Sequence, residues 1–266
     1  MILHENFNTE KIWRDIITQQ VTHISLVPSM LEKLLDISEQ APPPSLRVAL
    51  IGGAALRKSL ANRAISAGWP LCPTYGMSEM ASQVATRLAG NESNQALPLL
   101  PEVQAKVLID GKLLEQGTGQ LYLKAKNMMA GYANVQNKPG LGLDNNNWLI
   151  TSDIARLDAL GNIQIIGRAD DVLISGGEKI HPAEIESILL DCPGITQVCV
   201  IGQQDTHWGQ RLCAVYCGNY DHKQLEQWCR SKLRGVYLPR HYLRVKNLPE
   251  LANGKIDRKR VILKFC

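Results

Sequence analysis

The sequence predicts an α/β protein in which a section of alternating strands and helices is followed by a strand-rich section and then by a mixed section. Up to about residue 86, short apolar runs alternate with stretches of helical periodicity, which is the pattern of a parallel sheet. From 102 to 167, short strand-like runs are separated by Gly, Asn and Asp turns, which is typical of a small antiparallel or barrel-like section. After Asp171 helical and strand patterns mix again. We place a boundary at 167–171, giving domains 1–167 (α/β portion about 1–95, β-barrel section about 96–167) and 168–266.

The first section is predicted to start with a helix capped by Asn8 or Thr9, because short polar side chains of this kind accept hydrogen bonds from free amides at a helix start. Pro28 fits the first turn of another helix. The expected elements, in chain order, are a helix over 10–17, a strand over 24–27, a helix over 28–37, a strand over 46–51 and a helix over 57–67.

The later sections follow from the same rules. Pro182 predicts a helix start, and Glu184 favours the positive end of that helix. The remaining expected elements are strands over 103–109, 119–124, 162–166, 198–201 and 211–217, and a helix over 221–234.

Composition excludes several classes of protein. With 45% hydrophobic and 20% charged residues among 266, the chain is neither disordered nor fibrous. A net charge of +4 gives little support for a nucleic-acid or membrane partner, and the basic residues from Lys255 to Lys264 are interpreted as a solvated tail. The seven cysteines form no CxxC pair, and the start of the chain shows no leader, so we expect a cytoplasmic protein with reduced thiols.

Two glycine-containing segments are the first candidates for a ligand site. Gly52, Gly53 and Ala54 follow an apolar run, and Thr74-Tyr75-Gly76-Met77-Ser78-Glu79 follows the next one. Glycine lets a planar ligand approach the backbone, Tyr75 could stack on a purine, and Glu79 could hold a divalent metal. Taken alone, the segment from Thr74 to Glu79 is better interpreted as a tight turn with a half-buried tyrosine and a surface glutamate.

Three further segments favour a ligand site over a simple turn. They are Trp148 to Asp153, the stretch from Gly167 through Asp171 to Pro182, and Asn253 to Arg258. In this order the segment 74–79 and these three segments resemble the motif series of the adenylate-forming superfamily, which contains acyl- and aryl-CoA synthetases, peptide-synthetase adenylation domains and luciferase. The runs 75–82 and 175–178 look most like aryl-CoA ligases, with the o-succinylbenzoate-CoA ligases of menaquinone synthesis nearest.

The resemblance implies a fold and an activity. The fold would be the C-terminal part of a large α/β domain with a β-barrel section, followed by a small, mobile α+β domain. The activity would be that of an ATP-dependent, AMP-forming acid–CoA ligase. ATP, Mg²⁺ and coenzyme A would be its cofactors and a small carboxylic aryl acid its substrate.

The resemblance also implies residue roles. Asp153 would accept the ribose hydroxyls, Arg168 would reach the same ribose with Ile165 packing beneath, and Lys255 would stabilise charge at the α-phosphate. The bland alternative for Asp153 and Arg168 is a surface ion pair. The residues that would bind nucleotide are Gly52, Gly53, Ala54, Thr74, Tyr75, Gly76, Met77 and Ser78, with Glu79 placing Mg²⁺.

Coenzyme A would use a glycine loop in the small domain. Ser175, Gly176 and Gly177 would line the pantetheine tunnel, where missing side chains leave room, and Asp170 would be the hinge on which that domain rotates. The alternative for the glycines is a hairpin turn. His181 is given no catalytic role, and the cysteines need none because coenzyme A supplies the thiol.

Three departures from the family pattern limit the prediction. A Ser/Thr/Gly-rich phosphate loop ending in Pro-Lys is missing, so we expect roughly 150 to 200 residues to be absent, supplied by an N-terminal segment or a complementary polypeptide. Ser78 and Ser152 replace the more usual Thr and Gly. An inactive remnant that binds nucleotide or coenzyme A, or a carrier-protein-linked adenylation domain, therefore stays open, and His23, Ser25 and Gly53 would line what remains of the acid pocket.

Overall fold

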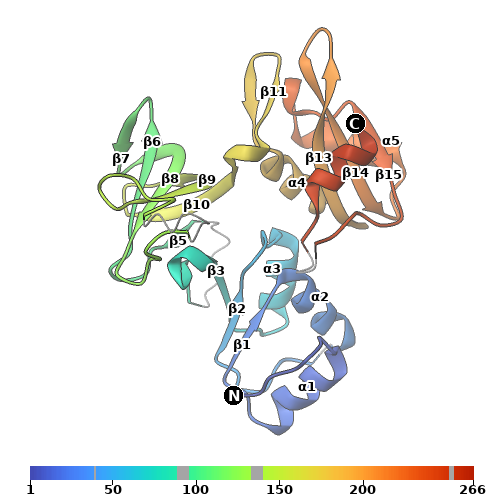
Figure 1. Cartoon of the computed structure of the whole chain (residues 1–266). Helices are drawn as coiled ribbons and strands as arrows, with labels where there is room; N and C mark the ends of the chain where they lie inside the picture. Colours follow the sequence, from blue (N-terminus) through green and yellow to red (C-terminus); the bar gives the residue numbers. More distant parts are fainter. Residues whose placement is uncertain (39, 89–95, 133–139, 252–254) are drawn as a thin grey trace. The chain divides into compact units, whose positions relative to one another are not determined.

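The computed structural model describes residues 1–38, 40–88, 96–132, 140–251 and 255–266. These form two compact units, and Figure 1 shows the chain order of their elements. Unit 1 comprises Met1–Thr151 and Ala155–Ile165, and unit 2 comprises Ser152–Ile154 and Ile166–Cys266. In the described part of the chain no helix is long and apolar enough to cross a membrane.

Unit 1 begins with a four-stranded sheet in the order β1-β2-β3-β4. The pairs β1–β2 and β2–β3 are parallel and β3–β4 is antiparallel. The strands are β1 (His23–Leu26), β2 (Val48–Ile51), β3 (Leu71–Met77) and β4 (Ser82–Thr86), and the helices are α1 (Thr9–Thr18), α2 (Pro28–Ile37) and α3 (Lys58–Ser66). The predicted alternation of strand and helix is confirmed.

Local sequence explains where these helices start and which faces they bury. Asn8 caps α1 by accepting a hydrogen bond from the Lys11 amide at 2.8 Å, so the capping residue is Asn8 rather than Thr9. Ile12 and Ile16, one helical turn apart, are buried in the same core as Leu31 and Leu34 of α2. The expected strand from residue 46 begins only at Val48, because Leu46 closes a turn onto the Pro43 carbonyl.

A second sheet, which lies mainly in unit 1, has six strands in the order β5-β10-β9-β8-β6-β7; residues 152–154 of β9 and 166–168 of β10 are assigned to unit 2. They are β5 (Leu97–Pro98), β6 (Gln104–Ile109), β7 (Lys112–Leu114), β8 (Gly117–Lys124), β9 (Leu149–Leu157) and β10 (Asn162–Arg168). The pairs β5–β10, β6–β7 and β6–β8 are antiparallel, as predicted. Strand β9 was not predicted, since its first half had been interpreted as a nucleotide motif without a backbone assignment.

Unit 2 is built on a five-stranded sheet in the order β12-β11-β14-β13, with β15 pairing to β14. Its strands are β11 (Leu173–Ser175), β12 (Glu178–Ile180), β13 (Ile195–Asp205), β14 (Gly209–Gly218) and β15 (His241–Arg244). Its helices are α4 (Pro182–Leu190), α5 (His222–Lys232) and α6 (Arg258–Phe265). Short 3-10 turns are η1 (Ser78–Met80) in unit 1, and η2 (Ala169–Asp171) and η3 (Gly235–Tyr237) in unit 2.

Both faces of the unit 2 sheet are buried. Val198 and Val200 of β13 face the core shared with α4 and α5, whereas Cys199 and Ile201 face the core that contains Val261 of α6. Lys255, Lys259, Arg260 and Lys264 are exposed, as predicted for a solvated run, but Arg258 is partly buried. Val261 of α6 is fully buried against the sheet.

All seven cysteines are free thiols, and all except Cys266 are buried. Burial raises the pKa of Cys199 and of Cys213 to about 12. These thiols stay protonated at neutral pH, as expected for packing residues.

Candidate active site

The first group of predicted site residues lies at the carboxyl ends of β2 and β3. Ile51, the last residue of β2, pairs with Pro73, and Gly52 follows directly. A Cβ added at Gly52 would meet the Thr74 methyl group at 2.8 Å, and Gly53 has a positive φ of 79°. Ligands of α/β proteins bind at this edge of a parallel sheet, because chain ends and backbone amides converge there. Gly52, Gly53 and Thr74 are thus brought together, with the exposed Ala54 next in the turn.

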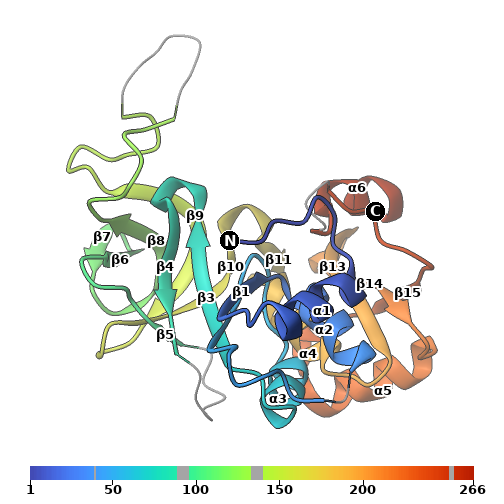
Figure 2. The ribbon, with the colours of Figure 1, turned by 90° about the horizontal axis from the view of Figure 1, so that it is seen from below.

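The segment from Thr74 to Glu79 turns sharply at the end of β3. Thr74, Tyr75, Gly76 and Met77 belong to β3, and Ser78 and Glu79 belong to η1. The pairing with β4 shifts by one residue between Tyr75 and Gly76, which marks a β-bulge. A Cβ at Gly76 would lie 1.8 Å from the Ser82 carbonyl oxygen, so only glycine allows the two strands this approach (Figure 2).

Glu79, the predicted metal ligand, is held from two sides. Its carboxylate accepts a hydrogen bond from the Tyr132 hydroxyl at 2.5 Å, and its carbonyl accepts one from the Met129 amide at 2.8 Å. Sequence reasoning missed Tyr132, which is 53 residues away in the chain. Within the described ranges no cluster of three or more His, Cys, Asp or Glu side chains is placed to hold a metal ion. A Mg²⁺ ion can take one protein carboxylate and complete its shell with water and substrate phosphates, and the metal role of Glu79 stays a prediction.

The second group lies in unit 2. Arg168, at the end of β10, is 3.4 Å from the Asp153 carboxylate on β9 and 3.3 Å from the Asp170 carboxylate on η2. The Asp153 side chain is 14% exposed and that of Arg168 is 53% exposed. Ile165, on the same strand as Arg168, is exposed. The pair thus presents a fixed carboxylate beside a solvent-facing guanidinium, a combination that suits a ligand with hydroxyl groups.

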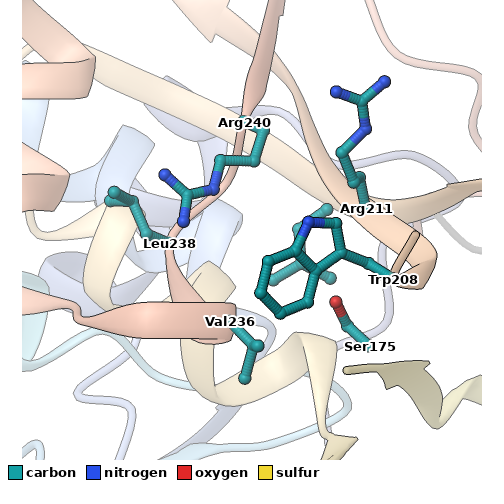
Figure 3. Close-up of a pocket in the computed structure, with 7 residues that line it drawn as sticks. Ser175, Trp208, Arg211, Val236, Leu238 and Arg240 are labelled. Carbon is teal, nitrogen blue, oxygen red and sulfur yellow. The ribbon is translucent and has the colours of Figure 1, made fainter. Parts of the chain in front are cut away.

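The glycine loop joins β11 to β12. Gly176 and Gly177 have φ values of 57° and 83°, and the Gly176 amide donates to the Trp208 carbonyl at 2.9 Å. Beside it lies a pocket of about 160 Å³ into which the Trp208 ring projects (Figure 3). It is lined by Ser175, Trp208, Arg211, Leu212, Val236, Leu238 and Arg240. Sequence reasoning found Ser175 but missed Trp208 and Arg240. The local signal at Trp208 is a turn held by Asp205, which accepts a hydrogen bond from the Trp208 amide.

Lys255, the predicted catalytic residue, is exposed in a hairpin that leads into α6. Its carbonyl accepts from the Leu251 amide at 2.8 Å, and Ile256 forms a β-bridge with Glu250. The Asp257 amide donates to the Pro249 carbonyl at 2.8 Å, and its carboxylate caps α6. The motif residues Asn253 and Gly254 lie outside the described residues.

Comparison with known proteins gives the class. Residues 1–133 match the family of AMP-binding enzymes, and residues 184–255 match the C-terminal domain of the same family. The chain belongs to the AMP-binding enzymes, and the mixed α/β fold matches the C-terminal part of adenylate-forming structures.

Particular relatives carry a narrower name. A 2-succinylbenzoate–CoA ligase of Listeria monocytogenes is 32% identical over 97% of this chain and 55% of its own length, and one of Bacillus mycoides has the same values. An o-succinylbenzoate CoA synthetase of Bacillus subtilis, in complex with its acyl-adenylate, has a TM-score of 0.85 at 30% identity over 97% of this chain and 54% of its own. An amide bond synthetase of Marinactinospora thermotolerans has a TM-score of 0.88 at 25% identity, with 99% and 57% covered. The chain spans about half the length of the relatives it matches.

Proposed function

We propose that this protein takes part in the ATP-dependent formation of an acyl-CoA thioester, with o-succinylbenzoate as the acid. In the first step the carboxylate attacks the α-phosphorus of ATP and pyrophosphate leaves. In the second step the thiol of coenzyme A attacks the acyl carbon and AMP leaves. The observation that carries the proposal is the contact between Asp153 and Arg168, 15 residues apart, in a chain that belongs to the AMP-binding enzymes.

In unit 1 the proposal assigns nucleotide binding to the ends of β2 and β3. The backbone of Gly52, Gly53 and Ala54 would face the base, and the residues from Thr74 to Ser78 would hold the base and α-phosphate. Glu79 would hold Mg²⁺, which neutralises phosphate charge as pyrophosphate leaves. Two observations support this: Gly52 and Gly76 let the strand ends approach one another closely, and Tyr132 fixes the orientation of the Glu79 carboxylate.

The proposal assigns the ribose to Asp153 and Arg168 of unit 2, and Ile165, three residues before Arg168 on β10, is proposed to pack beneath it. A carboxylate that is 14% exposed keeps its position while both oxygens accept hydroxyl protons. Lys255 would stabilise the negative charge that develops when the acid attacks the α-phosphate, because a compact ammonium concentrates positive charge at one point. The backbone contacts of Lys255 and Ile256 support a defined main-chain position from which this side chain extends.

Coenzyme A is assigned to the glycine loop and the adjoining pocket. Ser175, Gly176 and Gly177 would contact the pantetheine arm. The indole of Trp208 and the guanidinium of Arg240 give the pocket an aromatic face and positive charge, which match the base and phosphates of coenzyme A. We further propose that residues 1–167 and 168–266 act as two domains, with Asp170 as the hinge between the two half-reactions.

The test is exchange of labelled pyrophosphate into ATP in the presence of o-succinylbenzoate. Because the 266 residues contain no Ser/Thr/Gly-rich loop ending in Pro-Lys, it is run on the chain alone and on the chain combined with the N-terminal part of the Listeria ligase. Acid-dependent exchange in either sample supports the proposal. No exchange in both, with AMP or coenzyme A still bound, contradicts it and favours a binding protein without ligase activity. Exchange that is followed by acyl transfer only to a carrier protein contradicts the coenzyme A part.

A further inference from the structure

Arg258 is the one basic residue of the terminal run that the structure shows to be engaged by three separate segments of unit 2. Its Nε atom is 3.3 Å from the Asp171 carboxylate on η2. Its Nη2 atom donates to Glu186 Oε1 on α4 at 2.6 Å, and its Nη1 atom donates to the Val200 carbonyl on β13 at 2.6 Å. The side chain is 21% exposed. None of the steps proposed above uses this cluster.

The cluster of Arg258, Asp171 and Glu186 is charged, and its hydrogen bonds fix the positions of its side chains. Glu186 Oε1 also accepts from the Val200 amide at 2.7 Å, so both peptide groups of one β13 residue are engaged. Burial raises the pKa of Glu186, while Arg258 opposes that shift. Burial is the largest single influence on Arg258 and acts to lower its pKa, but the charges of Glu186, Cys199 and Asp171 together with the Glu186 hydrogen bond raise the pKa of Arg258. The guanidinium therefore stays charged, and its planar fork fixes three acceptors at once.

Arg258 lies in the chain where the Lys255 hairpin meets α6. Arg258 is the first residue of α6, and the Lys255 hairpin is closed just before it by the bridge between Glu250 and Ile256. On the other side, Asp171 is the last residue of η2, whose N-cap is Arg168. One side chain thus joins the base of the Lys255 hairpin to the turn that continues from the proposed ribose-binding arginine.

We infer that Arg258 is a positioning residue for Lys255. It fixes residues 255–257, which pair with 249–251, to η2 and α4, so that the ammonium of Lys255 is presented in one orientation rather than many. An exposed salt bridge would not fix the segment in this way, because exposed ion pairs constrain the positions of their side chains only weakly. A buried guanidinium with three partners does, since breaking one contact strands a charge. The role of Lys255 rests on the proposed function, whereas the fixing of the hairpin rests on the contacts alone.

The first experiment measures the fixing directly, by hydrogen exchange of the Leu251 and Asp257 amides, which bond to Lys255 and Pro249 across the hairpin. Arg258→Gln is expected to speed their exchange about 10- to 100-fold, the range for losing a charged hydrogen bond. Lys259→Gln is the matched control, because Lys259 is exposed on the same helix. Equal exchange in the two variants would overturn the inference.

A second variant guards against misfolding, because Arg258→Gln leaves Glu186 buried without its partner charge. Asp171→Asn removes one longer contact and leaves the pair with Glu186 intact. It is expected to speed hairpin exchange by a smaller factor while the amides of β14 stay protected. Hairpin exchange that stays at the wild-type rate in Asp171→Asn would contradict the link to η2.

The second experiment separates positioning from general stability. In the sample that exchanges pyrophosphate, Arg258→Gln should lower kcat for exchange at least tenfold and leave thioester formation from a preformed acyl-adenylate within twofold. Arg258→Lys should fall between, because one ammonium cannot reach three acceptors. Equal losses in both half-reactions would overturn the inference. If wild-type protein shows no exchange, the proposed function fails, and the hairpin measurement alone decides the role of Arg258.

Discussion

Replacing Gly76 with alanine tests whether the β-bulge in β3 sets the position of the Tyr75–Glu79 segment. The added Cβ would lie 1.8 Å from the Ser82 carbonyl oxygen and 2.9 Å from the Gln83 Cα. Real Cβ contacts stay beyond 3.0 Å, so the strands must separate by at least 1.2 Å, the difference between 3.0 and 1.8. Hydrogen bonds between β3 and β4 cannot stretch that far, and the pairing of Gly76 with Gln83 is lost.

The cost follows from these losses. One or two strand hydrogen bonds at about 1 kcal/mol each, together with about 1 to 3 kcal/mol of overpacking strain, give about 3 kcal/mol. The assay is hydrogen exchange of the β3 and β4 amides, which should speed up more than about 100-fold. The control is Gly111→Ala, where φ is 76° and nothing lies within 4 Å of the added atom, so only about 1 kcal/mol is expected. Equal effects of the two substitutions on β3 and β4 would refute the reasoning.

Three further predictions concern unit 2. Hydrogen bonds from the amides of Trp208 and His207 lower the pKa of Asp205, so the Asp205 carboxylate stabilises the fold fully above the ordinary pKa of 3.8 and loses this effect as pH falls through the lowered pKa. The difference in unfolding free energy between wild type and Asp205→Asn, measured by urea unfolding, should therefore vanish in acid. A difference that persists in acid would contradict this. Asp153→Asn should change the free energy of unfolding by less than about 1 kcal/mol, because its partner Arg168 is half exposed. It should nevertheless raise the KM for ATP about 100-fold, because charged hydrogen bonds to the ribose are lost. An unchanged KM for ATP would exclude the ribose role. Trp208→Ala should raise the KM for coenzyme A about tenfold and leave pyrophosphate exchange unchanged. A variant that loses pyrophosphate exchange but keeps its KM for coenzyme A would show that the pocket does not serve coenzyme A.

Much of the fold follows from local sequence. Asn8 caps α1, Pro28 and Pro182 start helices, and Asp221 closes a capping box at the start of α5, because each depends on residues within one turn. The elements that were missed depend on distant partners. Strand β9 gains its burial from neighbouring strands, and the basic sequence of α6 conceals the single valine, Val261, that is fully buried.

The candidate site likewise contains residues that local sequence could identify and residues that it could not. Segments such as Thr74–Glu79 and Ser175–Gly177 could be found because their glycines and short polar residues form compact patterns. Tyr132, Trp208 and Arg258 could not, because what defines them is a contact made across the fold. The partner of Tyr132 lies 53 residues away, and Glu186 lies 72 residues from Arg258. Such pairs leave no local pattern in a single sequence.

Lys255 carries the central claim, and comparison of the two half-reactions in Lys255→Ala tests it most directly. The measurement uses the sample that exchanges pyrophosphate, first with o-succinylbenzoate and ATP, then with preformed acyl-adenylate and coenzyme A. A 100- to 1,000-fold loss of exchange, about the effect of removing one transition-state charge contact, with thioester formation retained, is the predicted result. Exchange at the wild-type rate in Lys255→Ala would contradict the account.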